Sequence, residues 1–379
     1  MVINLDTRSI ESDSAVEIYI SATPKHNAPL QKQALEIFSG IRDTLHLKNA
    51  HILHERIFTS EHTTEGILKA RAQAYGDLDD GVVPSILLGK KNMTGPITSV
   101  QIHAVNTDSK PEVFDVDGSL CGRILRSPAC TYLTLSSVSA GQYDKADEQA
   151  KAIMAKAESA LKKFSSNFFS VARTWMWLGN ILSWYDEFNQ VRNGFFKKQK
   201  LIGKNNQQLM PASTGIGLGL TNGSKCAMDL FAVLKPQGSI QYLQAAGNQH
   251  CAFNYGSAFA RASKVITPAG QTVFVSGTAS IDAKGATTHI DNPSGQINTT
   301  IENVRAVLKD SNINDKDVVQ AVAYCKTKEV EDIFNDLKDA LAWPCITVIC
   351  DICRPDLLFE IEATALKPNK SHFTPQYLI

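Results

Sequence analysis

The hydrophobic and polar positions of the chain follow one pattern that occurs three times. Each occurrence ends in a block that starts with proline, continues as an apolar strand, breaks for a short polar stretch and closes in a second apolar strand. The three blocks are residues 84–105, 211–236 and 344–368, so their starts lie 127 and 133 residues apart. Near-equal spacing of such similar blocks indicates an internal repeat.

Four further elements precede each proline in the same order: strand, helix, strand, helix. Helices are predicted where apolar residues recur at intervals of three and four, and strands where they are continuous or alternate. These elements are 16–23, 29–45, 51–59 and 64–75 in the first copy, 132–139, 145–163, 171–178 and 181–196 in the second, and 273–280, 296–309, 319–326 and 329–341 in the third.

The repeated unit is therefore predicted to be β-α-β-α-β-β, and the chain to be an α+β protein of three tandem units. We place the units at residues 1–109, 110–237 and 238–379, with additional leading strands at 114–126 and 239–265. Any α+β chain shows some rhythm of this kind, but here the order, the proline and the spacing agree.

Each unit has two helices on one face of its sheet, so the other face must be covered by something else. Three copies cover one another if they surround a pseudo-threefold axis, as subunits do in a closed ring. We therefore predict a compact, barrel-like pseudo-trimer formed within a monomer.

Charge and composition narrow the classes of function. The chain has 38 basic and 38 acidic residues, which argues against a nucleic-acid partner. No apolar run approaches the roughly 18 residues that span a bilayer, and the first 20 residues lack an apolar secretory core. We therefore expect no membrane partner and a cytoplasmic location. The eight cysteines are spread along the chain and are expected to be free thiols.

No metal or cofactor site is predicted. Cys350 and Cys353 form a CxxC pair, but residues three apart on a strand face opposite sides, and no second pair exists to complete a zinc site. The segment 217–223 contains three glycines, but it precedes no helix and so does not fit a phosphate-binding loop.

Two carboxylates on the last predicted strand are candidates for chemistry. Glu360 and Glu362 are two residues apart, so they point to one face, and their neighbours Phe359, Ile361 and Ala363 are apolar. A carboxylate in such a setting is costly unless it is paired or has a raised pKa. Glu360 is therefore either a general acid or part of a salt bridge, and the pattern does not decide between them.

The third copy resembles the Rid superfamily, a group of small proteins that includes many imine deaminases and forms homotrimers with ligand sites between subunits. The segments that carry the resemblance are 271–282, 295–313 and 360–366. More specifically, the chain is similar to the chorismatases, which end in a Rid-like domain. That similarity rests on 211–217, 254–263 and 350–362, and more loosely on 172–177.

The resemblance implies a role for each of several residues. Glu360 would protonate the enol ether of chorismate and drive the loss of pyruvate, and Cys353 would mark the type whose product is 3-hydroxybenzoate. Implied substrate-binding residues are Arg261, Arg173, Tyr255, Gly277, Thr278, Ser213 and Thr214. Gln101 and Asp229 are assigned to the position of Glu360 in the other two copies, so only one of the three clefts is expected to carry this glutamate. The working cleft is expected between the second and third copies, because the strand that starts at Ser213 and Thr214 corresponds to the one that faces the neighbouring unit's glutamate in a Rid trimer.

Each of these residues also has a structural interpretation. Arg261 and Arg173 suit bidentate binding of carboxylates but equally suit ion pairs between units. Tyr255 is either a hydrogen-bond donor or a packing residue, and Gly277 suits either a close approach to a ligand or a β-bulge. The thiol of Cys353 is either a buried small hydrophobe or, beside a neighbouring arginine, partly ionised.

The chain departs from both family patterns. Rid deaminases have an arginine two residues after the proline, where this chain has Ile86, Ser213 and Ile346, so simple imine deamination is not expected. Chorismatases have an arginine after a tyrosine–glycine pair, where this chain has Ser257. Our leading hypothesis is a chorismatase-like lyase or hydrolase that acts on a small-molecule carboxylate. The alternatives are another enol or enamine substrate, or a non-catalytic small-molecule-binding pseudo-trimer.

Overall fold

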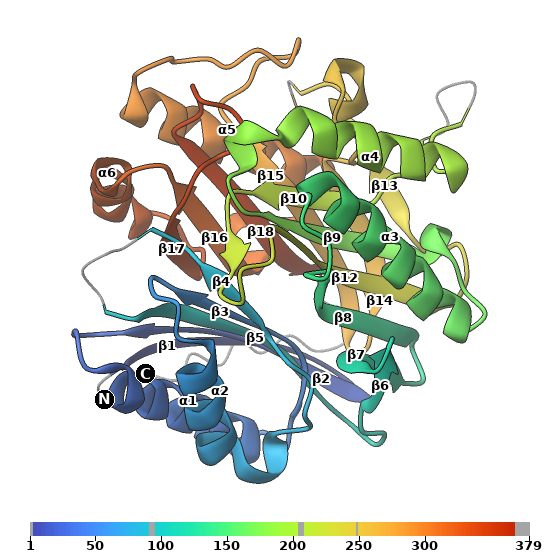
Figure 1. The fold of residues 1–379 in the computed structure, drawn as a ribbon, viewed down its shortest axis with the longest axis vertical. Helices are drawn as coiled ribbons and strands as arrows, with labels where there is room; N and C mark the ends of the chain where they lie inside the picture. Colours follow the sequence, from blue (N-terminus) through green and yellow to red (C-terminus); the bar gives the residue numbers. More distant parts are fainter. Residues whose placement is uncertain (1–2, 91–94, 204–207, 248, 368–379) are drawn as a thin grey trace.

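The computed structural model describes residues 3–90, 95–203, 208–247 and 249–367. Their strands form three six-stranded sheets, each accompanied by two long helices (Figure 1). The first sheet has the order β1-β2-β5-β3-β4-β11. Its elements are β1 (Ile3–Ser12), β2 (Ala15–Pro24), α1 (Leu30–Leu47), β3 (His51–Thr59), α2 (Thr64–Tyr75), β4 (Ser85–Leu88), β5 (Ile97–Thr107) and, from later in the chain, β11 (Gly219–Leu220).

The second sheet has the order β10-β9-β12-β8-β7-β6 and the third β13-β14-β15-β18-β16-β17. Elements of the second are β6 (Glu112–Val116), β7 (Ser119–Arg126), β8 (Thr131–Ser139), α3 (Ala146–Lys163), β9 (Val171–Leu178), α4 (Tyr185–Lys198), β10 (Ala212–Ile216) and β12 (Cys226–Lys235). Elements of the third are β13 (Gln241–Leu243), β14 (Ala262–Thr267), β15 (Gly270–Ala279), α5 (Pro293–Asp310), β16 (Val318–Cys325), α6 (Lys328–Lys338), β17 (Cys345–Ile349) and β18 (Phe359–Lys367). Short 3-10 turns occur at Gly76–Leu78, Phe168–Ser170, Ile181–Ser183, Ala252–Tyr255 and Asp315–Asp317.

The three sheets share one internal arrangement, which confirms the predicted tandem α+β fold. In each, the last long strand lies between the two core strands, and the strand after the proline pairs in parallel with the second core strand. The parallel pairs are β3 with β4, β9 with β10 and β16 with β17. An extra strand of this kind follows an α-helical crossover, as parallel pairing requires.

Apolar side chains form one core inside each unit and a further core among the units. The helices of each unit pack on one face of its own sheet, as α1 does through Ile37, Phe38 and Ile41. The opposite faces of all three sheets meet in a single cluster that contains Phe58, Trp177 and Tyr324, together with residues from each sheet. Figure 1 shows the same arrangement, with the helix pairs at the periphery and the sheets inside.

The expectation of a barrel needs correction. The sheets remain separate, because the units meet mainly through side chains in the shared core. The backbone links between units in the described residues are short. They include the pairing of β11 with β4, single bridges that join Ala212 to Ala260 and Gly217 to Asp351, and a hydrogen bond from the Lys90 N–H to the Ile349 carbonyl. The result is a pseudo-trimer of three sheets without a closed barrel.

Three details of the predicted elements also differ. The strand β1 was not expected, because as an edge strand it is largely polar and carries only two buried residues, Ile3 and Ile10. The predicted leading strand at 239–265 is two strands, β13 and β14, separated by the turn Ala252–Tyr255. The helix expected from residue 181 begins at Tyr185, after a 3-10 turn.

The ladder register corrects the assignment of equivalent residues in the other copies. Glu360 lies opposite Tyr324, which pairs with Val348, four residues after its proline. Asp229 lies opposite Trp175 and Gln101 opposite Arg56, and those partners pair three residues and one residue after their prolines. Bulges in these ladders shift the register, so the three residues occupy different levels. No helix in the described parts of the chain is long and apolar enough to cross a membrane.

Candidate active site

A small cleft lies between the second and third sheets and contains most of the predicted site residues. It encloses about 50 Å³. Six predicted residues line it: Ser213, Tyr255, Arg261, Gly277, Cys353 and Glu360. Four lining residues with polar side chains were not assigned a role from the sequence: Tyr185, Arg192, Ser257 and Arg354. The position between the second and third units is the one that the resemblance implied.

Glu360 is a buried carboxyl at the end of this cleft. It lies on β18, opposite Ala279 of β15 and Tyr324 of β16, and is 4% exposed. Burial raises its pKa to about 8, and the charge of Glu362 adds to the increase. Within the described residues, no side chain forms a hydrogen bond or ion pair with it. The carboxyl is therefore protonated at neutral pH, in the state that a general acid requires.

Glu362 has the opposite environment although it shares the same strand face. It accepts hydrogen bonds from Arg56 at 2.6 Å, from Arg173 at 2.8 Å and from the indole of Trp175. Burial opposes its ionisation, but the two guanidiniums hold its pKa below the usual range. Two neighbouring carboxyls whose pKa values are pushed apart are typical of acid–base sites.

Gly277 leaves the space that the Glu360 carboxyl occupies. A Cβ at this position would lie 2.0 Å from Oε1 of Glu360. The register of β15 against β18 shifts between Val275 and Thr278, so Gly277 lies in a bulge. Its N–H donates to Thr214 Oγ1 at 3.0 Å. The glycine is therefore required for the carboxyl beside it, because any side chain would occupy the same space.

Three predicted binding residues lie behind the cleft. Arg173 is committed to Glu362, and Thr214 accepts a hydrogen bond from the same guanidinium. Burial lowers the pKa of Arg173 to about 10, so it stays charged. The buried hydroxyl of Thr278 donates to the Ser276 carbonyl at 2.9 Å. None of the three is among the residues that line the cleft.

Arg261 and Tyr255 form the wall opposite the glutamate. Arg261 is 1% exposed and donates to the His250 carbonyl at 2.9 and 3.1 Å and to the Tyr255 hydroxyl at 2.8 Å. The guanidinium of Arg354 stacks over the Tyr255 ring at 5.4 Å and donates to the Gly285 carbonyl. Burial raises the pKa of Tyr255, so its hydroxyl remains a hydrogen-bond donor at neutral pH.

Cys353 holds a protonated thiol next to the acid. The residue as a whole is partly exposed, but its thiol is enclosed. Burial raises its pKa to about 12, and the nearby Glu360 adds to this increase. Of the two alternatives for this thiol, the enclosed neutral group is favoured over a partly ionised one beside Arg354, because desolvation outweighs the arginine. The neutral thiol shapes the cleft floor and is not a nucleophile at neutral pH.

Comparison with known proteins identifies the fold of this chain. Residues 256–367 match the family model of endoribonuclease L-PSP. A crystal structure of a chorismatase superposes with a TM-score of 0.62 at 20% sequence identity, covering 83% of this chain and 93% of the chorismatase. The C-terminal third of the chain is therefore similar to the endoribonuclease L-PSP family, and the chain as a whole has the fold of the chorismatase structure. No curated protein sequence matches it significantly.

Single-unit proteins also superpose on part of the chain. A probable translation initiation inhibitor from Rhodopseudomonas palustris is 16% identical and covers 35% of this chain and 100% of its own, with a TM-score of 0.30. The YjgF gene product of E. coli is 17% identical and covers 34% and 99%, with a TM-score of 0.27.

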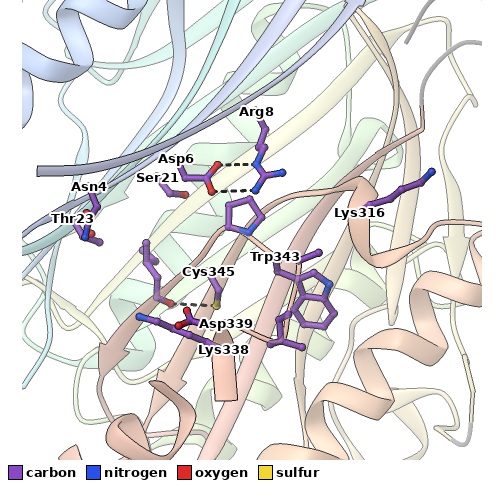
Figure 2. Close-up of a pocket in the computed structure, with 14 residues that line it drawn as sticks. Asn4, Asp6, Arg8, Ser21, Thr23, Lys316, Lys338, Asp339, Trp343 and Cys345 are labelled. Atoms are coloured by element: carbon purple, nitrogen blue, oxygen red, sulfur yellow. Dashed lines mark hydrogen bonds and ion pairs between the residues drawn. The ribbon is translucent and has the colours of Figure 1, made fainter. Parts of the chain in front are cut away.

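Two other grooves between units of this chorismatase fold are larger but chemically different. The groove between the first and third sheets has about 640 Å³, and Figure 2 shows Arg8 there pointing at the carboxylate of Asp6. Lys316, on its other side, is exposed. Neither groove is lined, within the described residues, by a buried glutamate with a raised pKa. Size is therefore a poor guide to the active cleft here.

The interface between the first and second sheets contains a buried polar network. Asp229 accepts hydrogen bonds from Ser85 at 2.5 Å, from the Ser137 N–H at 2.8 Å and from His54 Nε2 at 3.0 Å. Burial lowers the pKa of His54, so its ring is neutral. The network uses the polar groups of this interface for cohesion between units.

Arg192 and Tyr185 were missed because they lie on a helix that was treated as packing. A signal was available, because Phe188, Arg192 and Phe196 follow one another at intervals of four residues. An arginine in the middle of an apolar stripe is unusual, since arginine is rarely fully buried unless it is paired. All three side chains are in fact buried on α4.

Proposed function

We propose that the chain is a chorismatase-like enzyme that cleaves the enol-pyruvyl ether of chorismate, or of a related small carboxylate, and releases pyruvate. The observation that carries the proposal is the state of Glu360: protonated, without an ion pair among the described residues, and facing a cleft lined by Arg192, Arg261 and Arg354. A glutamate on the surface would be ionised at neutral pH, and a glutamate with a structural role would be paired, as Glu362 is. The eight free cysteines support a cytoplasmic setting.

The proposed reaction begins with proton transfer from Glu360 to the terminal methylene carbon of the enol ether. The adjacent carbon becomes an oxocarbenium ion, which the Glu360 carboxylate, now ionised, stabilises electrostatically. Addition of water gives a hemiketal that collapses to pyruvate and a ring alcohol. If the ring aromatises instead, pyruvate and a hydroxybenzoate together contain all the atoms of chorismate, so this route needs no net water. The neutral thiol of Cys353 lies where it can exclude water and favour the aromatic product.

The cleft is nearly closed in this conformation. Its free space of about 50 Å³ holds only a few water molecules. A ring-sized substrate therefore enters when side chains at the mouth move outward. Phe259 and Arg354 are suited to this movement because both are partly exposed.

A second candidate is hydrolysis of another enol or enamine metabolite in the same cleft. It is favoured by Ser257, which lines the cleft where the chorismatase pattern has an arginine. The acid chemistry of Glu360 would be the same, but the leaving group would differ. A non-catalytic binder is the third alternative, and it is disfavoured by a protonated acid that makes no structural hydrogen bond among the described residues.

The decisive experiment incubates the purified protein with chorismate and follows pyruvate and hydroxybenzoate by chromatography. Glu360→Gln keeps the shape of the side chain but removes the proton donor, so we expect a loss of about 10²- to 10⁴-fold in rate. Glu302→Gln, at an exposed position of α5, is the matched control and should retain activity. No turnover by the unmodified protein at high concentration would reject the proposal. Activity retained by Glu360→Gln would reject the role of this residue.

A further inference from the structure

Arg192 is a charged side chain enclosed by aromatic rings. It is 1% exposed and lies on the inner side of α4. Its guanidinium carbon is 5.1 Å from the ring centre of Phe188 and 5.7 Å from that of Phe259. Aromatic faces attract cations, but a buried charge without a counterion remains costly. Something must balance this charge in the working protein.

The protein itself supplies little for this guanidinium. Nη2 donates to the amide oxygen of Asn189 at 2.6 Å, and the hydroxyl of Tyr185 lies nearby. Nε is buried and has no hydrogen-bond partner. In the described part of the chain, Arg192 forms no ion pair, and burial lowers its pKa below the ordinary value. Its charge therefore has no counterion among the described residues, and at least one of its N–H donors has no acceptor.

The other buried arginines show what this protein does when an arginine is structural. Outside the cleft, each of them is paired with a carboxylate. The pairs are Arg56 and Arg173 with Glu362, Arg71 with Glu55 and Asp79, and Arg123 with Asp80. Within the cleft, Arg192 and Arg261 are as deeply buried but contact only neutral oxygen atoms. The buried arginines that lack a carboxylate partner are therefore those that line the cleft.

The two unpaired guanidiniums also contact the same aromatic side chain. Both are within 6 Å of the same ring, that of Phe259, at 5.7 Å for Arg192 and 5.5 Å for Arg261. The neighbouring Arg354 adds a third positive charge to the cleft wall. Glu360, which is neutral at neutral pH, does not offset them. A ligand with two negative groups would pair both buried arginines, whereas a single negative group would leave one of them unpaired.

We propose that Arg192 is a specificity-determining residue that binds the second anionic group of the ligand, with Arg261 binding the first. The cleft then selects small molecules that carry two carboxylates over those that carry one. This inference rests on the proposed function for the site itself, but it concerns ligand charge and not the bond that is cleaved.

The test measures binding and folding separately from turnover. Titration calorimetry is performed in the Glu360→Gln background with chorismate, with benzene-1,3-dicarboxylate and with benzoate. Arg192→Met keeps length and removes the charge. We expect it to weaken binding of both dianions about 10- to 100-fold, the range for a charge-assisted hydrogen-bonded pair, and to change benzoate binding much less. The thermal midpoint should stay the same or rise, because an unpaired buried charge has been removed.

Arg173→Met is the matched control, because it removes an equally buried arginine that is paired. It should lower the thermal midpoint, since it leaves Glu362 with one guanidinium. Unchanged dianion affinity in Arg192→Met, a lowered midpoint for that variant, or no binding of either dianion by the unmodified cleft would each overturn the proposal. Dicarboxylate binding that depends on Arg192 without turnover of chorismate would support the anchor and reject the proposed reaction. Turnover of chorismate by the unmodified protein, together with an unchanged KM in Arg192→Met, would support the proposed reaction and reject the role of Arg192.

Discussion

Glu360 and Glu362 point to the same face of β18, but only Glu362 has guanidiniums within hydrogen-bond distance. The charge that Arg56 and Arg173 stabilise on Glu362 in turn disfavours a second charge on Glu360. The pKa of Glu360 rises from 4.5 to about 8, and each pKa unit corresponds to about 1.4 kcal/mol. Ionising Glu360 in the empty cleft therefore costs roughly 5 kcal/mol more than in water, so the carboxyl keeps its proton at neutral pH until a substrate accepts it.

This charge state predicts the pH dependence of catalysis. Because Glu360 acts in its protonated form, kcat/KM should be constant through neutral pH and fall tenfold per pH unit above about 8. The raised pKa also means that the folded state loses stability as the pH rises from the ordinary carboxyl range through about 8 and keeps it below that range. Initial rates and urea midpoints between pH 5 and 10 test both. A rate that already falls above pH 5 would contradict the assignment of Glu360 as a buried acid.

The residues of the site were predictable only where strand geometry alone determines them. The spacing of Glu360 and Glu362 placed both on one face, as the structure confirms. Which of them is paired could not be predicted, because Arg56 is 306 residues earlier in the chain. Arg173 and Thr214 belong to the correct strands but lie one layer behind the cleft. A role for Arg192 depends on how α4 packs against the third unit, which no local pattern contains.

At the scale of elements, Glu362 joins strands from all three sheets. It belongs to β18, Arg56 to β3, and Arg173 and Trp175 to β9. The four side chains form one buried cluster that lies among the apolar residues of the shared core. Helices and core strands were predicted well because burial on one face imposes a clear period. The polar edge strand β1 was missed because edge position weakens that period.

Breaking this cluster should destabilise the whole fold. Glu362→Gln keeps the size of the side chain but leaves two buried guanidiniums without a counterion, so we expect a loss of about 3–5 kcal/mol in the free energy of unfolding. Asp43→Asn, which disrupts the exposed Arg42–Asp43 pair, is the control and should change it by at most about 1 kcal/mol. Urea denaturation monitored by tryptophan fluorescence measures both. Equal effects of the two substitutions would show that the central cluster adds little.

At the scale of the whole molecule, each sheet has one face covered by its own helices and the other by the two remaining sheets. The shared core includes Tyr132, Trp177 and Tyr324, which are fully buried. Among the strands that the structure describes, no open sheet face of this kind is therefore left to drive further association. The three-unit arrangement was predictable from the repeat, because an uncovered sheet face must find a partner. The separation of the three sheets could not be predicted, because backbone pairing between units depends on how closely their edge strands approach one another.

The covered faces predict that the chain is a monomer in solution. Light scattering coupled to size-exclusion chromatography should give a mass close to the 41.4 kDa of one chain at micromolar concentration. A mass three times larger would mean that each chain contributes one cleft wall to a neighbour, and would contradict closure of the ring within one polypeptide.

The polar network of Ser85, Asp229 and His54 has a consequence for symmetry. In an assembly of three identical subunits, every substitution appears at all three interfaces at once. A residue that stabilises one interface is therefore present at the other two as well. Joining the units in one polypeptide removes this restriction. The interface between the first and second units can be stabilised by a polar network, while the one between the second and third units keeps an acid and its arginines. Such a molecule would bind one ligand per polypeptide, where a symmetric trimer of the same mass would bind three.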